Sequence, residues 1–336
     1  MASTETTGTA GIARPERAAP TTTQPTLDDT RPPAHRTAMT VERDAGLPGH
    51  GRPAMLFLAP FVVLYVLFII GPAIYGLVMS FFDTSLVKSG LGDFAGLANY
   101  AEAISSRDFW SSLWHTIWFT ILTTPPLVIV SFFFALLAER ARRARWFFRL
   151  AFFLPYVLPS AVVALIWIWL YTPVLGLFTR WAVKLGFTEP NWLGDPNLAM
   201  FSLALTTLWW TLGFNFVLYL AGLQDIPRDL YEASSIDGAG PWQQIWRITV
   251  PMLRRTTMLV VVLQVIASLK VFDQIYLMQQ FGPGPENSTR PAIQYIYESG
   301  FTQQRVGYAS AMSFAFFLVV VAISLALFSL LRRTQR

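Results

Sequence analysis

Residues 224–251, QDIPRDLYEASSIDGAGPWQQIWRITVP, carry the most local information in the chain. Pro227 suits the first turn of a helix, and Gly238 suits the end of one because glycine adopts a positive φ at little cost. Pro241 can begin a second short helix, and Pro251 precedes a long apolar stretch. The stretch therefore predicts a helix–turn–helix connector that does not itself cross a membrane.

Six long apolar stretches surround this connector, four before it and two after it. A helix rises 1.5 Å per residue, so about 20 apolar residues cross a hydrocarbon core of about 30 Å. Only 13% of the residues are charged, against about 25% in a typical soluble domain. We therefore predict an all-α integral membrane protein with six transmembrane helices, over residues 54–82, 112–138, 150–171, 198–223, 256–280 and 306–331.

The distribution of Arg and Lys predicts the direction of these spans. With the N-terminus in the cytoplasm, 18 Arg and Lys lie in cytoplasmic segments and 6 in external ones, while Lys270 falls within a span. Cytoplasmic loops of membrane proteins carry the excess of these residues. The sequence thus predicts that both termini and the connector 224–251 are cytoplasmic, and that the net charge of +5 reflects topology rather than nucleic-acid binding.

Residues 1–52 differ from the rest of the chain. They contain eleven Thr and no Phe, Trp or Tyr. Such a segment buries too little apolar surface to offset the entropy lost on ordering. We expect a disordered cytoplasmic tail, with residues 53–336 forming the transmembrane domain; a regulatory or docking arm is the alternative.

The composition excludes several kinds of chemistry. The chain has no Cys and three scattered His, so it offers no disulfide, no thiol nucleophile and no zinc-binding cluster. No Lys follows a Gly, so the phosphate-binding P-loop motif is missing. We expect no cofactor, no metal and no enzymatic activity of the chain's own.

The connector resembles the EAA loop of the permease subunits of ABC importers. The family pattern is EAA, three residues, Gly, nine residues, Ile, any residue, Leu-Pro. Here Ser234 stands for the second Ala and Val250 for the Leu. In that family the loop forms a short cytosolic helix that couples the permease to its ATPase subunit. The resemblance implies that role for Glu232, Ala233, Ser234, Asp237, Gly238, Ile248 and Pro251.

Further strings resemble the carbohydrate-uptake branch of this family, the maltose-type and glycerol-3-phosphate-type permeases. They are GLANY (96–100), RLAFFLPYVLPS (149–160), LAGLQDIPRDLYEA (220–233), LKVFDQIYLM (269–278) and GYASAM (307–312). The resemblance implies a bacterial inner-membrane subunit that translocates a sugar by alternating access. It also implies three partners: a homodimeric ABC ATPase, a second homologous permease and an extracytoplasmic solute-binding protein.

Helical rise suggests which side chains lie near the middle of the membrane. Trp209, Trp210 and Asn215 in the fourth span, and Gln264 and Ser268 in the fifth, are candidates for the solute pathway because indole rings stack on sugars and polar groups bond their hydroxyls. Packing between helices is an equally good interpretation of each. Trp167 and Trp169 are expected in an outer aromatic belt.

Lys270 and Asp273 are three residues apart, so on a helix they could form an ion pair at the outer gate. Direct contact with solute is the alternative for these two residues.

Two other functions compete with the importer. An ion-driven secondary transporter is expected to show inverted repeats, and none is evident between residues 54–171 and 198–331. A membrane enzyme would need acids or His clustered at the membrane surface, whereas the loops offer scattered acids. Which solute is carried, a sugar or a glycerol-phosphate ester, is not readable from the residues.

Overall fold

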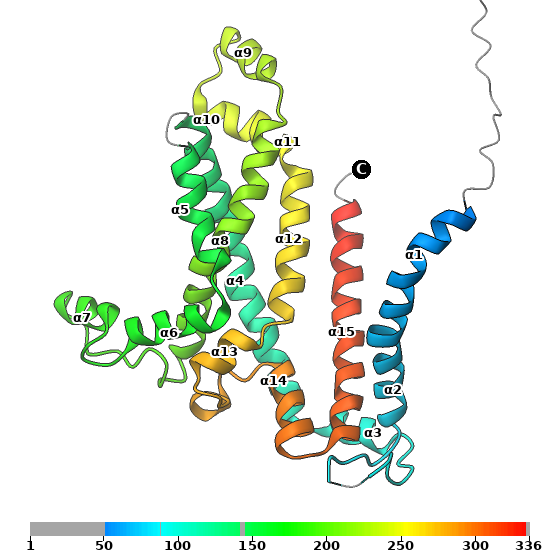
Figure 1. Ribbon diagram of the computed structural model, residues 1–336. Helices are drawn as coiled ribbons and strands as arrows, with labels where there is room; N and C mark the ends of the chain where they lie inside the picture. The colour runs from blue at the N-terminus through cyan, green and yellow to red at the C-terminus, as the bar shows by residue number, and fades with distance from the viewer. Residues whose placement is uncertain (1–50, 88, 142–144, 334–336) are drawn as a thin grey trace, which may run out of the picture. The chain divides into compact units, whose positions relative to one another are not determined.

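The computed structural model describes residues 51–87, 89–141 and 145–333 (Figure 1). The predicted disordered tail, apart from its last two residues, lies outside them. The packing divides the chain between Ala59 and Pro60, and the larger unit runs from Pro60 to Arg336 and is called the body. Its described residues form helices, with isolated bridges between Phe82 and Phe94 and between Ser85 and Arg305 in place of a sheet.

Within the described part of the chain, four helical segments are each long and apolar enough to cross a membrane alone. The first joins α1 (Gly51–Tyr65), a π-helical turn (Val66–Ile70) and α2 (Gly71–Met79). The others are α4 (Arg107–Arg140), α8 (Ala199–Gln224) and α15 (Val306–Arg333). The Pro125–Pro126 pair does not end α4, and four predicted spans are thus found as single helical segments.

The core lies where α4 packs on α8, and α5 (Arg145–Val157) packs against both of these helices. Leu127, Phe216 and Leu220 are fully buried there. Gly213 permits the close approach of α5, because a Cβ at this position would collide with the backbone carbonyl of Phe152. A second cluster joins α4, α14 (Ala292–Tyr297) and α15.

The predicted third span, 150–171, is not one straight helix. Helix α5 ends at Val157, α6 (Ser160–Tyr171) begins at Ser160, and the two axes differ by 98°. Pro159 has an extended ψ of 145° and precedes the first turn of α6. Because a residue before proline avoids helical geometry, the pair Leu158–Pro159 ends one helix and starts another.

The predicted fifth span, 256–280, is also divided. Helix α12 (Arg254–Leu269) ends before Lys270, and α13 (Asp273–Met278) starts a new helix. Phe272 between them has φ −151° and ψ −69°, far from helical values. A second bend of 63° separates α12 from the segment Pro241–Met252. The described residues therefore contain four single spans, or six if each bent pair counts as one.

The connector lies at one end of the body and the short helices at the other (Figure 1). The first end holds α9 (Arg228–Ile236), α10 (Pro241–Gln244), a π-helical segment (Ile245–Thr249) and α11 (Val250–Met252). The second end holds α3 (Ala98–Ser105), α7 (Leu177–Lys184), α13, α14 and a π-helical turn (Glu298–Thr302).

Ion pairs tie separate helices together at this second end. Arg305 forms two hydrogen bonds of 2.6 Å with the carboxylate of Glu102, joining the start of α15 to α3. These bonds hold the pKa of Glu102 below its ordinary value of 4.5. The buried Arg290 lies 3.2 Å from Asp108, which joins the start of α4 to the segment before α14.

Candidate functional site

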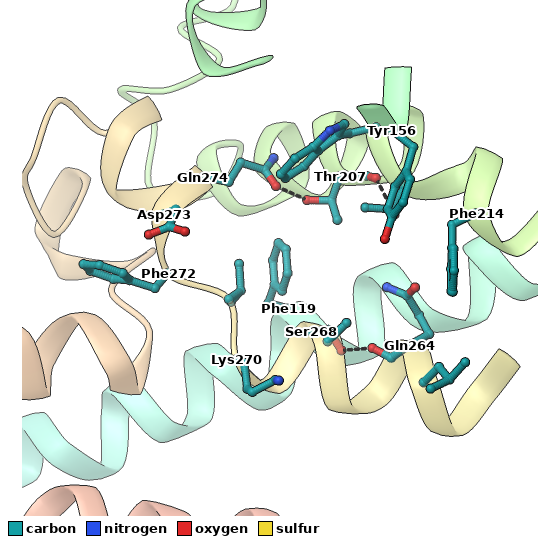
Figure 2. Close-up of a pocket in the computed structure, with 15 residues that line it drawn as sticks. Phe119, Tyr156, Thr207, Phe214, Gln264, Ser268, Lys270, Phe272, Asp273 and Gln274 are labelled. Carbon is teal, nitrogen blue, oxygen red and sulfur yellow. Dashed lines mark hydrogen bonds between the residues drawn. The ribbon is translucent and has the colours of Figure 1, made fainter. Parts of the chain in front are cut away.

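A cavity of about 250 Å³ lies between α8, α12 and α13, beside the bend between α5 and α6 (Figure 2). Trp210 and Thr207 reach it from α8, and Gln264 and Ser268 from α12. Tyr156 and Phe119 add aromatic rings from α5 and α4. The helix breaks at 158–159 and 270–272 therefore border the same hollow.

The structure brings five of the seven predicted pathway and gate residues to this cavity: Trp210, Gln264, Ser268, Lys270 and Asp273. Trp209 is not among its lining residues. Its ring centroid lies 5.7 Å from that of Trp167, on another side of α8. Trp167 is buried in the core with Tyr171 and Phe178, so the expectation that it belongs to an outer aromatic belt is wrong.

Asn215 lies behind the cavity wall and holds one of the lining residues. Its side-chain amide donates a hydrogen bond of 3.1 Å to Oε1 of Gln264. The Ser268 hydroxyl donates to the backbone carbonyl oxygen of Gln264, one helical turn earlier in α12, at 2.9 Å. Asn215, Gln264 and Ser268 are all buried, so these bonds fix the polar side of the cavity.

The polar residues of the cavity that sequence reasoning missed include Gln274 and Thr207. The Thr207 hydroxyl lies 3.0 Å from Oε1 of Gln274 and can donate to it, which joins α8 to α13 (Figure 2). Both side chains are buried. Gln274 is a polar amide within a predicted span, the same feature that singled out Asn215, and that criterion applied evenly would have found it.

The break at Leu158–Pro159 also positions Trp210. The indole N–H of Trp210 donates to the Leu158 carbonyl oxygen at 3.2 Å. Because α6 starts only at Ser160, this carbonyl lies outside both helices and is open to a side-chain donor. The kink thus holds the ring of Trp210 at the cavity wall.

The predicted ion pair between Lys270 and Asp273 is not formed. Among the ion pairs recorded over residues 57–87, 89–141 and 146–330, none joins these two side chains. The prediction assumed a continuous helix, whereas Lys270 to Phe272 form a linker between α12 and α13. The two side chains stand at opposite ends of that linker and line different parts of the cavity (Figure 2).

The connector forms a separate exposed unit at the end of the body shown with α9 in Figure 1. Glu232, Ala233 and Asp237 are exposed on or beside α9, and Ile236 is 87% exposed. Gly238 ends the helix with φ +81°, as its position in the sequence predicted. Ser234 is partly buried because Nε2 of Gln244 lies 3.0 Å from its hydroxyl.

Further contacts fix α9 to the rest of the body. The Tyr231 hydroxyl lies 2.9 Å from that of Thr249, and Ile248 packs against the main core. Pro251 lies in the first turn of α11 and is exposed. A hollow of about 640 Å³ lies at the base of α9. It is lined by the last residues of α4 and α8 and by α9, including Glu139, Arg140, Arg228 and Glu232.

The described residues hold no group of three or more His, Asp or Glu that could bind a metal ion. The charged side chains of the cavity, Lys270 and Asp273, do not form an acid–base pair. The arrangement offers hydrogen-bonding and aromatic contacts to a polar molecule. It contains no nucleophile placed against a base.

Comparisons with known proteins agree with this architecture. The chain is 32% identical over 279 residues to the sulfoquinovosyl glycerol transport system permease protein SmoG of Agrobacterium fabrum, covering 83% of this chain and 90% of that protein. It is 31% identical over 272 residues to the arabinooligosaccharides transport system permease protein AraP of Bacillus subtilis, covering 80% and 85%. It is 30% identical over 273 residues to the sn-glycerol-3-phosphate transport system permease protein UgpA of A. fabrum, covering 80% and 91%.

The fold is also that of a solved transporter. The structure matches a chain of a bacterial ABC transporter that imports the acidic polysaccharide alginate, with a TM-score of 0.73 and 23% identity over 85% of this chain and 98% of that one. Residues 128–336 match the family described as the binding-protein-dependent transport system inner membrane component. The chain therefore belongs to this family of ABC importer permeases.

Proposed function

We propose that the chain is the membrane permease subunit of an ATP-driven importer that carries a sugar or a related polyol. The observation that carries the sugar assignment is the cavity, which brings the indole of Trp210 together with the fixed polar groups of Gln264 and Ser268. An aromatic face and convergent hydrogen-bonding groups are what a sugar ring requires of a site. Relatives named for sugars and oligosaccharides support the same class.

Six spans result if each bent helix pair crosses the membrane once. The excess of Arg and Lys then places both termini, and residues 1–52 with them, on the cytoplasmic side, and residues 53–336 form the transmembrane domain. In this orientation α9 is cytoplasmic and α7, α13 and α14 face outward. The importer would reside in a bacterial inner membrane.

Helix α9 is the proposed coupling helix. The exposed Glu232, Ala233 and Asp237, with Gly238 at the end of the helix, offer the surface on which an ATPase subunit docks. Ser234 bonds to Gln244 and Ile248 packs against the main core, and Pro251 completes the loop. The contacts of Tyr231 with Thr249 and of Gln244 with Ser234 would make α9 move with the segment leading into α12. ATP hydrolysis would belong to a homodimeric partner and not to this chain.

A second permease is the proposed partner within the membrane. Lys270 and Asp273 are both exposed and line the cavity at separate positions, where a second subunit could complete the wall. A solute-binding protein would deliver the sugar from outside. The spans would then rock about the cavity as ATP binds and is hydrolysed. Lys270 and Asp273 are better placed for solute or partner contact than for the ion pair predicted from sequence.

A glycerol-phosphate ester is the alternative solute. The amino group of Lys270 has no recorded carboxylate partner among the described residues and could meet a phosphate, and one group of relatives is named for such a solute. Asp273 at the same cavity disfavours an anion. A neutral or singly charged sugar is therefore the better fit. The family assignment leaves an ion-driven carrier without support.

The assembly can be tested by affinity purification of the tagged chain from membranes in mild detergent. We expect a P-loop ATPase and a second permease to co-purify, and a Gly238→Ala variant to lose the ATPase while keeping the permease. The associated solute-binding protein can then be screened against neutral sugars, uronic acids and glycerol phosphates. Recovery of this chain alone would contradict the proposal.

A further inference from the structure

Helix α7 has one face fixed to the body and one face without a partner among the described residues. Phe178 stacks on Trp167 with ring centroids 5.5 Å apart, and the Trp192 indole donates to the Thr179 hydroxyl at 3.0 Å. The first contact is with α6, and the second is with the segment that follows α7. These contacts anchor α7 to the body, whereas its remaining surface is exposed.

The exposed surface carries an apolar stripe. Leu177, Trp181 and Leu185 follow one another at four-residue spacing and are 39%, 54% and 76% exposed. Val174 and Leu175 before the helix, and Phe187 after it, are also exposed. Exposed apolar side chains gathered on a short surface helix mark contact with lipid or with another protein.

Two cations border the stripe and indicate which of these it is. At 100° per residue, Lys184 lies beside Leu177 on the helix and Arg180 lies next to Lys184. Both are exposed. Helix α7 itself contains no acid, and the next acid along the chain, Glu189, accepts the Val174 N–H at 2.7 Å. An apolar stripe with Lys and Arg at its border is typical of a helix lying in the membrane interface.

We propose that α7 lies flat in the outer membrane surface, with the stripe in the boundary between headgroups and acyl chains and with Arg180 and Lys184 on lipid phosphates. The proposal rests on the orientation under Proposed function, since α7 occupies the end of the body opposite α9 (Figure 1). It does not depend on the solute. The contact would brace α6, which carries Trp167 and lies beyond the bend that positions Trp210.

The chain has no Cys, so single cysteines report one site each. We would place a spin label at Leu177→Cys, Trp181→Cys or Leu185→Cys, with Arg180→Cys as the matched control on the polar border. The complex with its co-purified partners is placed in nanodiscs of phosphatidylcholine and phosphatidylglycerol. Stripe labels should relax several-fold more with oxygen than with a water-soluble nickel chelate, and the control label should show the reverse.

Two results would overturn the proposal. Nickel accessibility at the stripe would show that it faces water. Protection from both reagents, lost when the solute-binding protein or second permease is removed, would show that a protein covers it. Either result leaves the importer assignment intact, because ATP-driven uptake by the same complexes is measured separately.

The cationic border is tested in nanodiscs that lack phosphatidylglycerol. The oxygen accessibility at Trp181→Cys should fall in the otherwise unchanged chain. When Arg180→Gln and Lys184→Gln are added to Trp181→Cys, the oxygen accessibility should be low both with and without phosphatidylglycerol. When Arg180→Lys is added instead, the oxygen accessibility should still depend on phosphatidylglycerol. No response to phosphatidylglycerol in the unchanged background would contradict the contact with anionic headgroups.

Discussion

At the scale of single residues, the hydrogen bond between Asn215 and Gln264 joins α8 to α12 at the polar wall of the cavity. Such bonds within membrane proteins contribute about 0.6 kcal/mol on average and at most about 1.7 kcal/mol. We expect the double-mutant cycle of Asn215→Ala and Gln264→Ala, followed by unfolding in detergent, to give a coupling energy in that range. Additive effects of the two substitutions would show that the bond adds no stability.

The adjacent residues Trp209 and Trp210 make a matched pair for the solute pathway. Trp210 lines the cavity, whereas Trp209 contacts Trp167. An aromatic contact contributes about 0.5–1.5 kcal/mol, and about 1.4 kcal/mol is a factor of ten. We expect Trp210→Ala to lower uptake at low solute concentration by up to about tenfold, with Trp209→Ala close to the unchanged chain. Equal losses in the two variants would argue for packing in both positions.

The depth estimated from helical rise selected both Trp209 and Trp210, but it could not show which of them lines the cavity. Neighbouring residues on a helix point about 100° apart, so the choice depends on how α8 is rotated against α5 and α12. That rotation is set by contacts such as the fit of Gly213 to the Phe152 backbone, which no local pattern reveals. Gln264 and Ser268 were predicted together because their spacing of four places them on one face.

At the scale of elements, the end of α9 tests the coupling role. Gly238 and Gly240 both have open space where a Cβ would be added, but only Gly238 has a positive φ, of 81°. Alanine in the left-handed region costs about 1 kcal/mol or more, so Gly238→Ala should distort the turn after α9. We expect this variant to lose solute-stimulated ATP hydrolysis and Gly240→Ala to keep it, measured on the reconstituted complex. Equal ATP hydrolysis in the two variants would count against a coupling role for α9.

The ion pair between α3 and α15 predicts a pH dependence of stability. Because the hydrogen bonds from Arg305 lower the pKa of Glu102, the pair stabilises the fold above about pH 4.5 and its contribution is lost as pH falls through the lowered pKa. Both side chains are nearly half exposed, so the gain is about 0.2–1 kcal/mol. Glu102→Gln should lower the unfolding temperature at pH 7 and leave it unchanged near pH 3.

The control for this pair is Arg305→Lys, which keeps the charge but loses the two-pronged geometry. It should fall between the unchanged chain and Glu102→Gln at pH 7. The same difference between Glu102→Gln and the unchanged chain at both pH values would show that the effect is packing rather than ionisation.

Sequence patterns found the elements better than their breaks. The turn at Gly238 and the helix start at Pro227 follow from residue chemistry alone and agree with the structure. The break at Leu158–Pro159 carried a proline signal, yet Pro125–Pro126 carried a stronger one and left α4 continuous. The break at Lys270–Phe272 contains neither Gly nor Pro, so it reflects how α13 packs against α6.

At the scale of the whole molecule, composition and the apolar stretches predicted an all-helical membrane protein, and the resemblance of the connector to the EAA loop implied the importer family. The fold and the family match agree with that prediction. The cavity could be predicted only in part. It forms where the breaks at 158–159 and 270–272 meet α8, and the 98° bend between α5 and α6 is a tertiary feature that hydropathy does not record. Two of the cavity residues that were missed, Thr207 and Gln274, pair across the contact between α8 and α13.

The central claim is that this permease moves its solute only when an ATPase partner drives α9. The most direct measurement is the initial rate of solute uptake into proteoliposomes that hold the co-purified complex, with the solute-binding protein outside and ATP either enclosed or omitted. We predict uptake that requires ATP and the binding protein and is lost in the Gly238→Ala variant. Uptake at the same rate without ATP, driven by an imposed ion gradient, would contradict the account.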